Sequence, residues 1–185
     1  MKKNKRNFDI FHSQLELPFL ETYYEFLEEI FQTLESKFGL KKNSNQKFVD
    51  LGAGNGKVVI YTALNYNIKS YGFEINQNLT NEAEIKIKSL KKEGNYKKKL
   101  FRKMKIKLGD FFLLNLKDYD FIYIFSLPSM QKFLTHIFNT VKKGTIIISH
   151  KYPLVGFNSI LKYEYRLAHK NDKQEICTFF YKNIL

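Results

Sequence analysis

The 185-residue chain has a single cysteine, few arginines and no long apolar run, and each scarcity excludes a class of protein. Cys177 has no partner within the chain for a disulfide, which indicates a reducing compartment, and we expect a cytoplasmic protein. The longest apolar run, at residues 121–127, is far shorter than the roughly 20 residues that span a bilayer. The N-terminal Met-Lys-Lys-Asn-Lys-Arg leads into no apolar stretch of the signal-peptide type. We therefore expect no membrane anchor.

Arginine is scarce although the formal net charge is +13. Of the 31 basic residues, only Arg6, Arg102 and Arg166 are arginine. Nucleic-acid readers favour arginine for bidentate contacts, so a lysine-rich surplus is weak evidence for nucleic-acid binding. The densest basic cluster, in the region 91–107, predicts either a solvated loop or a docking surface for RNA, a membrane or an acidic protein. It contains Lys91, Lys92, Lys97, Lys98, Lys99, Arg102, Lys103, Lys105 and Lys107.

Length and composition predict one domain with a full core. Hydrophobic residues make up 44% of the chain and aromatic residues 16%, which is enough to bury a core. We expect a single domain over residues 1–185, a flexible basic segment at 1–15 and a monomer.

Apolar spacing predicts an alternation of helices and strands. A helical pattern covers residues 20–38, and Gly39 suits its C-terminal end, as Gly94 suits the end of a later helix. Ser129 is placed to cap another helix. The later helices are expected at 57–65, 79–90 and 130–141. Strands are expected at 48–50, 70–75, 105–108, 121–125 and 145–149.

The order of these elements predicts the fold class. Continuous apolar strands separated by helices indicate a mainly parallel sheet covered on both faces. The segments 161–167 and 176–181 flank a polar stretch and predict an antiparallel hairpin. The expected fold is therefore α/β: a Rossmann-like, doubly wound, mainly parallel seven-stranded sheet with an antiparallel C-terminal hairpin.

The most informative stretch is Lys-Phe-Val-Asp-Leu-Gly-Ala-Gly-Asn-Gly-Lys at residues 47–57, where a buried strand leads into three alternate glycines. Such glycines let the backbone turn sharply and let a ligand approach closely. The Gly-x-Gly-x-Gly spacing differs from the Gly-x-Gly-x-x-Gly of dinucleotide turns, and Asp50 precedes it. This favours S-adenosylmethionine (SAM), because Asp50 would attract its ammonium and loop N–H groups its carboxylate. A glycine-rich surface turn is the alternative. The expected loop residues are Asp50, Gly52, Ala53, Gly54 and Gly56.

The ends of the next two strands carry further candidate cofactor residues. Glu74 follows Asp50 by 24 residues, close to the interval of about 20 at which an acidic residue meets a ribose diol. We expect Glu74 to accept from both ribose hydroxyls, with Asn76 beside it. After the third strand, Asp110 could accept from the adenine amino group while Phe111 lies against the ring. A helix-capping aspartate is the alternative at that position.

The fourth strand ends in Phe-Ser-Leu-Pro-Ser-Met, at 125–130, and the methyl acceptor of a SAM-dependent enzyme should lie there. Displacement at a sulfonium methyl needs an in-line lone pair, so the protein mainly supplies alignment and exclusion of water. Ser126, Pro128 and Ser129 are the candidate residues of this turn. A rigid turn with Ser129 merely as an N-cap is the alternative. The Asn/Asp-Pro-Pro-aromatic turn of many base and glutamine N-methyltransferases is missing.

Together these motifs resemble the seven-strand (class I) SAM-dependent methyltransferases. More narrowly, residues 50–60, 71–76, 118–130 and 149–154 resemble the protein-lysine methyltransferase family. That family includes archaeal broad-specificity enzymes and mitochondrial enzymes that modify the ATP synthase c-subunit. The resemblance covers roughly residues 16–155.

The resemblance implies a Rossmann-like domain, SAM as cofactor and methyl transfer to the ε-amino group of lysine in a protein substrate. It also implies that the helix region 16–40, through Pro18, Phe19 and Thr22, closes over the cofactor. The chain departs from the family at Asn55, where an acidic residue is common. It also departs in the 149–154 segment, where Lys151 and Tyr152 stand in place of arginine and phenylalanine.

Several alternatives stay open at this stage. Tyr152 could line a lysine channel or pack in the core, and His150 could act as a base or have a structural role. The other histidines share no metal-ligand spacing with Cys177, so we expect no metal. Besides protein-lysine methylation, the sequence allows RNA methylation or a non-catalytic SAM-binding domain that docks another macromolecule.

Overall fold

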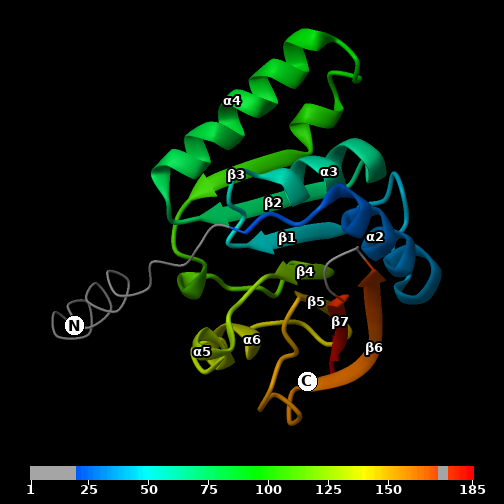
Figure 1. The fold of residues 1–185 in the computed structure, drawn as a ribbon, viewed down its shortest axis with the longest axis vertical. Coiled ribbons are helices and arrows are strands. Elements are labelled where there is room, and N and C mark those ends of the chain that lie inside the picture. Colours follow the sequence, from blue (N-terminus) through cyan, green and yellow to red (C-terminus); the bar gives the residue numbers. More distant parts are fainter. Residues whose placement is uncertain (1–19, 171–174) are drawn as a thin grey trace, which may run out of the picture.

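The computed structural model describes residues 20–170 and 175–185 (Figure 1). The expected flexible segment at 1–15, together with Pro18 and Phe19, lies outside the described residues. The described chain forms a seven-stranded sheet in the order β3-β2-β1-β4-β5-β7-β6. Its strands are β1 (Lys47–Leu51), β2 (Lys69–Glu74), β3 (Met104–Leu108), β4 (Phe121–Ile124), β5 (Ile146–His150), β6 (Leu161–Lys170) and β7 (Glu175–Asn183).

The first five strands are parallel, whereas β7 runs antiparallel to both β5 and β6. The strand order reverses between β1 and β4, which lie side by side although two strands separate them in the sequence. The antiparallel pair forms the edge opposite β3 (Figure 1). The predicted α/β fold with its C-terminal hairpin is therefore confirmed, and the strand ends differ from the expected ones by a few residues.

Helices cover both faces of the sheet. They are α2 (Tyr24–Phe38), α3 (Lys57–Tyr66), α4 (Gln77–Glu93), α5 (Pro128–Gln131) and α6 (Thr135–Phe138), with short 3₁₀ turns η1 (Leu100–Arg102) and η2 (Phe111–Leu113). Side chains alternate along each strand, so Phe48 packs with α2 on one face while Val49 packs with α6 on the other. These two apolar clusters lie on opposite sides of the central strands, and a third, smaller cluster packs α3 near β3 through Val59, Ala63 and Met104. No helix of the described residues is long and apolar enough to cross a membrane.

Glycines end the two long helices as predicted. Gly39 follows α2 with φ 71°, and Gly94 follows α4 with φ 76°. Both are in the left-handed conformation that favours glycine at a helix C-terminus.

The expected single helix at 130–141 is wrong, because the segment forms two short helices. The helical stretch begins earlier, with Pro128 at its first position, where the fixed φ of proline suits a helix start. Leu127 rather than Ser129 occupies the N-cap, and it makes no side-chain cap bond. The buried Gln131 side chain instead bonds the segment after β5, and we infer that this tertiary packing overrides the helical pattern.

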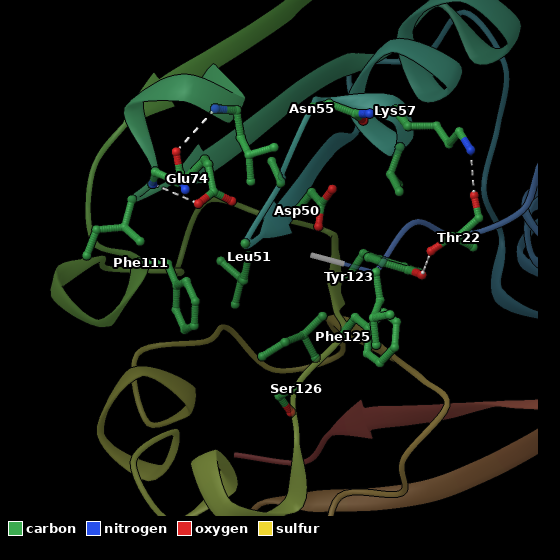
Figure 2. Close-up of a pocket in the computed structure, with 18 of the residues that line it drawn as sticks. Thr22, Asp50, Leu51, Asn55, Lys57, Glu74, Phe111, Tyr123, Phe125 and Ser126 are labelled. Atoms are coloured by element: carbon green, nitrogen blue, oxygen red, sulfur yellow. Dashed lines mark hydrogen bonds between the residues drawn. The ribbon is translucent and has the colours of Figure 1, made fainter. Parts of the chain in front are cut away.

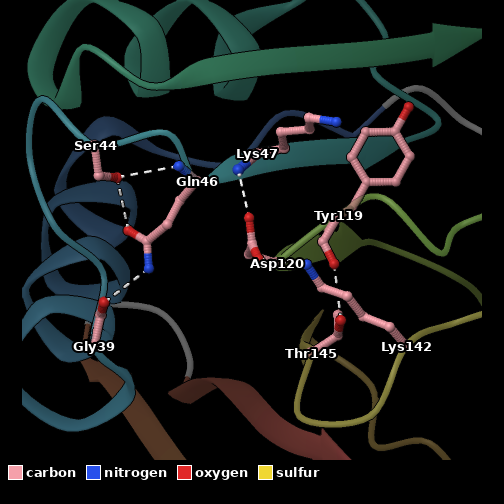
Figure 3. A network of polar contacts seen from close by, with 8 residues as sticks. All are labelled: Gly39, Ser44, Gln46, Lys47, Tyr119, Asp120, Lys142 and Thr145. Carbon is pink, nitrogen blue, oxygen red and sulfur yellow. Dashed lines mark hydrogen bonds and ion pairs between the residues drawn. The ribbon is translucent and has the colours of Figure 1, made fainter.

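A polar network around Asp120 holds the N-terminal ends of β1, β4 and β5 together (Figure 3). Its carboxylate accepts a hydrogen bond from the Lys47 N–H at 2.7 Å and pairs with the Lys142 ammonium at 2.6 Å. The Thr145 hydroxyl donates to the Tyr119 carbonyl at 2.8 Å. These contacts join the first residues of β1, β4 and β5. They help to fix the register of the three strands and therefore the positions of their carboxyl ends.

Candidate functional site

A cavity of about 690 Å³ opens beyond the carboxyl ends of β1, β2 and β4, where the strand order reverses (Figure 2). Open α/β sheets bind ligands at this point, and the volume is typical of a small-molecule site. Eight of the predicted site residues line the cavity: Asp50, Gly52, Ala53, Glu74, Asn76, Asp110, Phe111 and Ser126. The sheet thus gathers residues from four separate sequence motifs.

The glycine loop is tied to the end of β2. The N–H groups of Gly52 and Ala53 both donate to the Phe73 carbonyl at 2.9 Å. The Gly54 N–H donates to Glu74 Oε2 at 2.8 Å. All three loop glycines have positive φ, including 87° at Gly52, so a residue with a side chain would be strained there.

The three glycines differ in what surrounds them. A Cβ at Gly52 would meet nothing nearer than Phe111 Cε1 at 3.8 Å, and this glycine faces the cavity. A Cβ at Gly56 would lie 2.2 Å from Ile106 Cδ1, so Gly56 allows α3 to pack against β3. Gly54 and Gly56 are not among the residues that line the cavity.

Glu74 is almost fully buried and already accepts two hydrogen bonds. Its Oε1 accepts from the Asn76 N–H at 2.8 Å, and its Oε2 accepts from the Gly54 N–H. Each carboxylate oxygen retains a second lone pair that can accept from a ligand hydroxyl. Asn76 caps α4 through its Oδ1, which accepts from the Asn78 N–H at 2.9 Å. Loop and carboxylate are therefore one rigid unit.

Asp50 is the cavity carboxylate that most lacks a partner. It is 3% exposed, and no side chain or N–H group of the described residues donates a hydrogen bond to it. Burial, and secondarily the charge of Glu74, raise the pKa of Asp50 well above its ordinary value of 3.8. A bound cation would stabilise the ionised form. Asp50 is thus placed to select a positively charged ligand.

The third strand brings Asp110 and Phe111 to the same cavity. Asp110 Oδ1 accepts from the Phe112 N–H at 2.8 Å, which caps the short turn η2. The Phe111 ring lies over Gly52, and its centroid is 4.4 Å from that of Phe112. The capping role and a place in the cavity wall therefore coexist at this position.

Residues 20–22, which we call the strap, border the cavity (Figure 2). The Lys57 ammonium contacts Glu21 Oε2 at 2.7 Å and the Thr22 carbonyl at 3.0 Å. Thr22 Oγ1 and the Tyr123 hydroxyl are 2.7 Å apart. The hydrogen bond from Lys57 is the main cause of a lowered Glu21 pKa. The strap is therefore held by one residue of helix α3, Lys57, and by one residue of strand β4, Tyr123.

Lys57, Glu21 and Tyr123 also line the cavity, although the sequence patterns did not predict them as site residues. Tyr123 alternates with Phe125 along the end of β4, and this period of two was a usable signal. Glu21 and Lys57 are 36 residues apart, and no local pattern predicts their pairing.

The turn after β4 supplies the remaining wall. Ser126 is 1% exposed, and its hydroxyl has no hydrogen-bond partner among the described residues. Of the other residues predicted here, Pro128 and Ser129 are exposed and do not line the cavity. Tyr152 also lies outside the lining, but its ring centroid is 6.2 Å from that of Phe125, which lines it.

His150 is buried at the end of β5. Its Nδ1 is 2.8 Å from the Thr178 hydroxyl, and its ring packs edge-on against Phe125. Burial, followed by the charges of His169 and Lys151, lowers the pKa of His150 to about 3. This imidazole is neutral at neutral pH and is a weak base for a lysine ammonium of pKa about 10.4. Within the part of the chain that is described, no three His, Cys, Asp or Glu side chains gather as a metal site.

The chain is similar to known methyltransferases in sequence and in fold. The sequence model of the ANTKMT methyltransferase domain matches residues 50–160. A protein-lysine N-methyltransferase of Saccharolobus islandicus is 28% identical over 111 residues, covering 59% of this chain and 64% of that protein. The H3 lysine-79-specific histone-lysine N-methyltransferase of Emericella nidulans is 43% identical over 63 residues, covering 34% of this chain and 12% of that protein. The chain thus spans less than two thirds of either relative.

Among solved structures, an RNA methyltransferase from Salinibacter ruber in complex with S-adenosyl-L-homocysteine is similar, with a TM-score of 0.70. The match covers 89% of this chain and 94% of that chain at 18% identity. At this identity the likeness shows the fold alone.

Proposed function

We propose that this chain, which belongs to the ANTKMT methyltransferase domain family, is a SAM-dependent methyltransferase that methylates the ε-amino group of lysine residues in proteins. The methyl transfer is supported by the family match. The lysine acceptor is supported by the similarity to a protein-lysine N-methyltransferase.

The cavity residues fit the cofactor. Asp50, buried without a donor from the described residues, suits the ammonium of SAM, whereas the Gly52, Ala53 and Gly54 N–H groups expected to bind its carboxylate already donate within the protein, to the Phe73 carbonyl and to Glu74. The spare lone pairs of Glu74 suit the ribose hydroxyls, while Asp110 and Phe111 suit the adenine amino group and ring face. When bound, SAM supplies an electrophilic methyl group on a sulfonium. The side chains named here bind and orient it.

The observation that carries the lysine proposal is the meeting of two motifs beside the cavity. These motifs, 125–130 and 149–154, are the ones that resemble lysine methyltransferases most narrowly. The Gln131 amide donates to the Pro153 carbonyl at 2.7 Å, and its Oε1 accepts from the Val155 N–H at 3.0 Å. Gln131 directly follows the first motif, so it ties the second motif to the cavity wall that Phe125, Ser126, Leu127 and Met130 form.

This wall suits a lysine side chain. Phe125, Leu127 and Met130 give the cavity apolar surface near Ser126, whose hydroxyl has no hydrogen-bond partner among the described residues. A lysine in this surrounding loses hydration, which lowers its pKa and favours the neutral amine. The Ser126 hydroxyl can accept from that amine and hold its lone pair towards the cofactor. We propose Pro128 and Ser129 as residues that shape the turn rather than touch the amine.

The experiment that tests this proposal is incubation of the protein with isotope-labelled SAM and a cell extract. Mass spectrometry should detect labelled mono-, di- or trimethyl-lysine in protein, and the Gly54→Arg variant should give none. Label confined to other residues or to other molecules would contradict the lysine acceptor.

RNA methylation is the second candidate, and one observation favours it. Within the basic region 91–107, eight of the nine lysine and arginine side chains are exposed, and the described ion pairs include none of them. Such a surface attracts phosphate. Separate counting of label in RNA and protein fractions distinguishes the two acceptors. A non-catalytic domain would bind SAM and leave both fractions unlabelled.

The net positive charge of the whole chain also restricts which proteins are expected as substrates. A net charge of +13 repels strongly basic proteins. We therefore expect acidic or neutral substrates to carry most of the protein label.

A further inference from the structure

Lys151 lies over two aromatic rings beside the cavity. Its Nζ is 5.6 Å from the ring centroid of Tyr152 and 6.0 Å from that of Phe125. An ammonium at this distance is attracted to the negative face of an aromatic ring. Phe125 also lines the cavity, so the aromatic pair adjoins the place where a substrate lysine is expected.

The backbone holds Lys151 in a strained conformation. Its φ is 69°, and the Tyr152 N–H donates to the His150 carbonyl at 2.9 Å, so the three residues form a γ-turn of the rare positive-φ form. The Lys151 N–H donates to the Cys177 carbonyl at 2.7 Å, and the Ser149 hydroxyl donates to the Tyr152 carbonyl at 2.7 Å. Strain that neighbours maintain in this way is typical of functional positions.

Among the described residues, no acidic side chain pairs with the Lys151 ammonium. The rings of Phe125 and Tyr152 are thus its evident partners. A second ammonium of the same chemistry could take its place without breaking a salt bridge.

We propose that Phe125 and Tyr152 form the binding site for the ammonium of the substrate lysine, and that Lys151 occupies this site in the free protein as an internal competitor. The proposal rests on the lysine acceptor proposed above and adds the residues that recognise it. A substrate lysine must displace Lys151 before it reaches Ser126. The apparent affinity for substrate is therefore lowered by the fraction of time that Lys151 fills the site.

The test uses a small probe, because no protein substrate has to be known. Nα-acetyl-lysine methylamide is titrated into the full chain with S-adenosylhomocysteine present, and the Tyr152 ring signals are followed by NMR. Lys151→Met keeps the length of the side chain and removes its charge. Lys37→Met is the matched control, because it removes one charge and one cation–ring contact, with Tyr165 at 4.7 Å, from a different part of the fold.

We expect Lys151→Met to bind the probe about twofold to fivefold more tightly than the wild type, which corresponds to roughly 0.5–1 kcal/mol for a partly exposed ammonium over two rings. Lys37→Met should match the wild type, and Tyr152→Leu in the Lys151→Met background should lose the gain. Equal affinity in the Lys151→Met and Lys37→Met variants would overturn the proposal, as would no detectable binding to either.

Failure of this inference is separable from failure of the lysine acceptor. If protein lysines acquire label from the cell extract but Lys151→Met binds the probe no more tightly, the acceptor stands and the internal competitor does not. If the probe binds as expected and no protein lysine is labelled, the aromatic site stands and the transfer to lysine does not.

Discussion

The carboxylate of Glu74 accepts a hydrogen bond from the Gly54 N–H at 2.8 Å, so the carboxylate proposed to bind ribose also fixes the glycine loop. This bond joins the end of β2 to the turn that follows β1. One side chain thereby serves the shape of the cavity and, as we propose, the recognition of its ligand.

Replacing Glu74 should therefore weaken cofactor binding in two ways. In Glu74→Ala the ribose hydroxyls lose an acceptor, and the Gly54 N–H loses the bond that holds it in place. We expect SAM affinity to fall by about 1–3 kcal/mol, measured by calorimetry. Glu84→Ala is the control, because Glu84 lies exposed on α4 and forms only a long ion pair with Lys88, at 3.8 Å. Equal affinity in the two variants would remove Glu74 from the site.

Asp50→Asn should raise the stability of the cofactor-free protein while it weakens SAM binding. Because the folded protein raises the pKa of Asp50, the protonated carboxyl is favoured by folding. Its contribution to stability is complete below the ordinary value of 3.8 and is lost as the pH rises through the raised value. The neutral amide avoids that loss. We therefore expect the cofactor-free variant to be more stable than the wild type at neutral pH, measured by urea denaturation.

The same substitution should weaken SAM binding by about 1.5–3 kcal/mol, through the lost charged contact. In the wild type, SAM affinity should fall as the pH falls through the raised pKa of Asp50, since a cation binds the ionised carboxylate. Calorimetry in two buffers of different ionisation enthalpy should detect proton release on binding. A variant that is less stable and binds normally would show that Asp50 has a purely structural role.

Two glycine substitutions should distinguish steric crowding from backbone strain. Gly56→Ala would place a methyl group 2.2 Å from Ile106 Cδ1 and 3.1 Å from Ala83 Cβ. Gly94→Ala has almost the same φ, 76° against 77°, but nothing lies within 4 Å of its Cβ position. We expect Gly94→Ala to cost about 1 kcal/mol of unfolding free energy and Gly56→Ala several. Similar losses in chemical denaturation would contradict the packing role of Gly56.

Thr178→Val should destabilise the buried contact between two histidines. The Thr178 hydroxyl lies 2.8 Å from both His150 Nδ1 and His169 Nε2, while His169 Nδ1 contacts Glu29. The Thr178 hydroxyl therefore bridges the two imidazole rings. Valine has nearly the same shape but leaves both rings without this partner.

We expect Thr178→Val to lower the unfolding free energy by about 1–3 kcal/mol, measured with urea. Thr178→Ser retains the hydroxyl and should lose much less. If serine and valine destabilise the protein equally, the lost methyl contact rather than the hydrogen bond explains the effect.

The fold was predictable because its pattern is local. The apolar runs around Val49, Ile122 and Ile147 are buried strands, and Gly39 and Gly94 end helices where their positions indicated. The helix expected at 130–141 failed because its spacing competed with tertiary contacts that the sequence does not display. The bonds of the Gln131 side chain are such contacts, whereas the helix start at Pro128 was a local signal that could have been read from the sequence.

The site was predictable to the extent that parallel strands end together. Asp50 and Glu74 lie at the carboxyl ends of their strands and Asp110 lies just past the end of β3, and a parallel sheet brings all three to one cavity. The contacts between Lys57 and Glu21 and between Lys151 and Phe125 join segments that no sequence period relates. Such contacts depend on how loops return to the sheet.

The central claim is that SAM lies across the ends of β1, β2 and β3 with its methyl group directed at the turn after β4. The most direct measurement is a crystal structure of the complex with S-adenosylhomocysteine. The account predicts ribose hydroxyls on Glu74, the ammonium on Asp50 and the sulfur facing Ser126. A ligand bound elsewhere, or turned so that its sulfur faces away from Ser126, would contradict it.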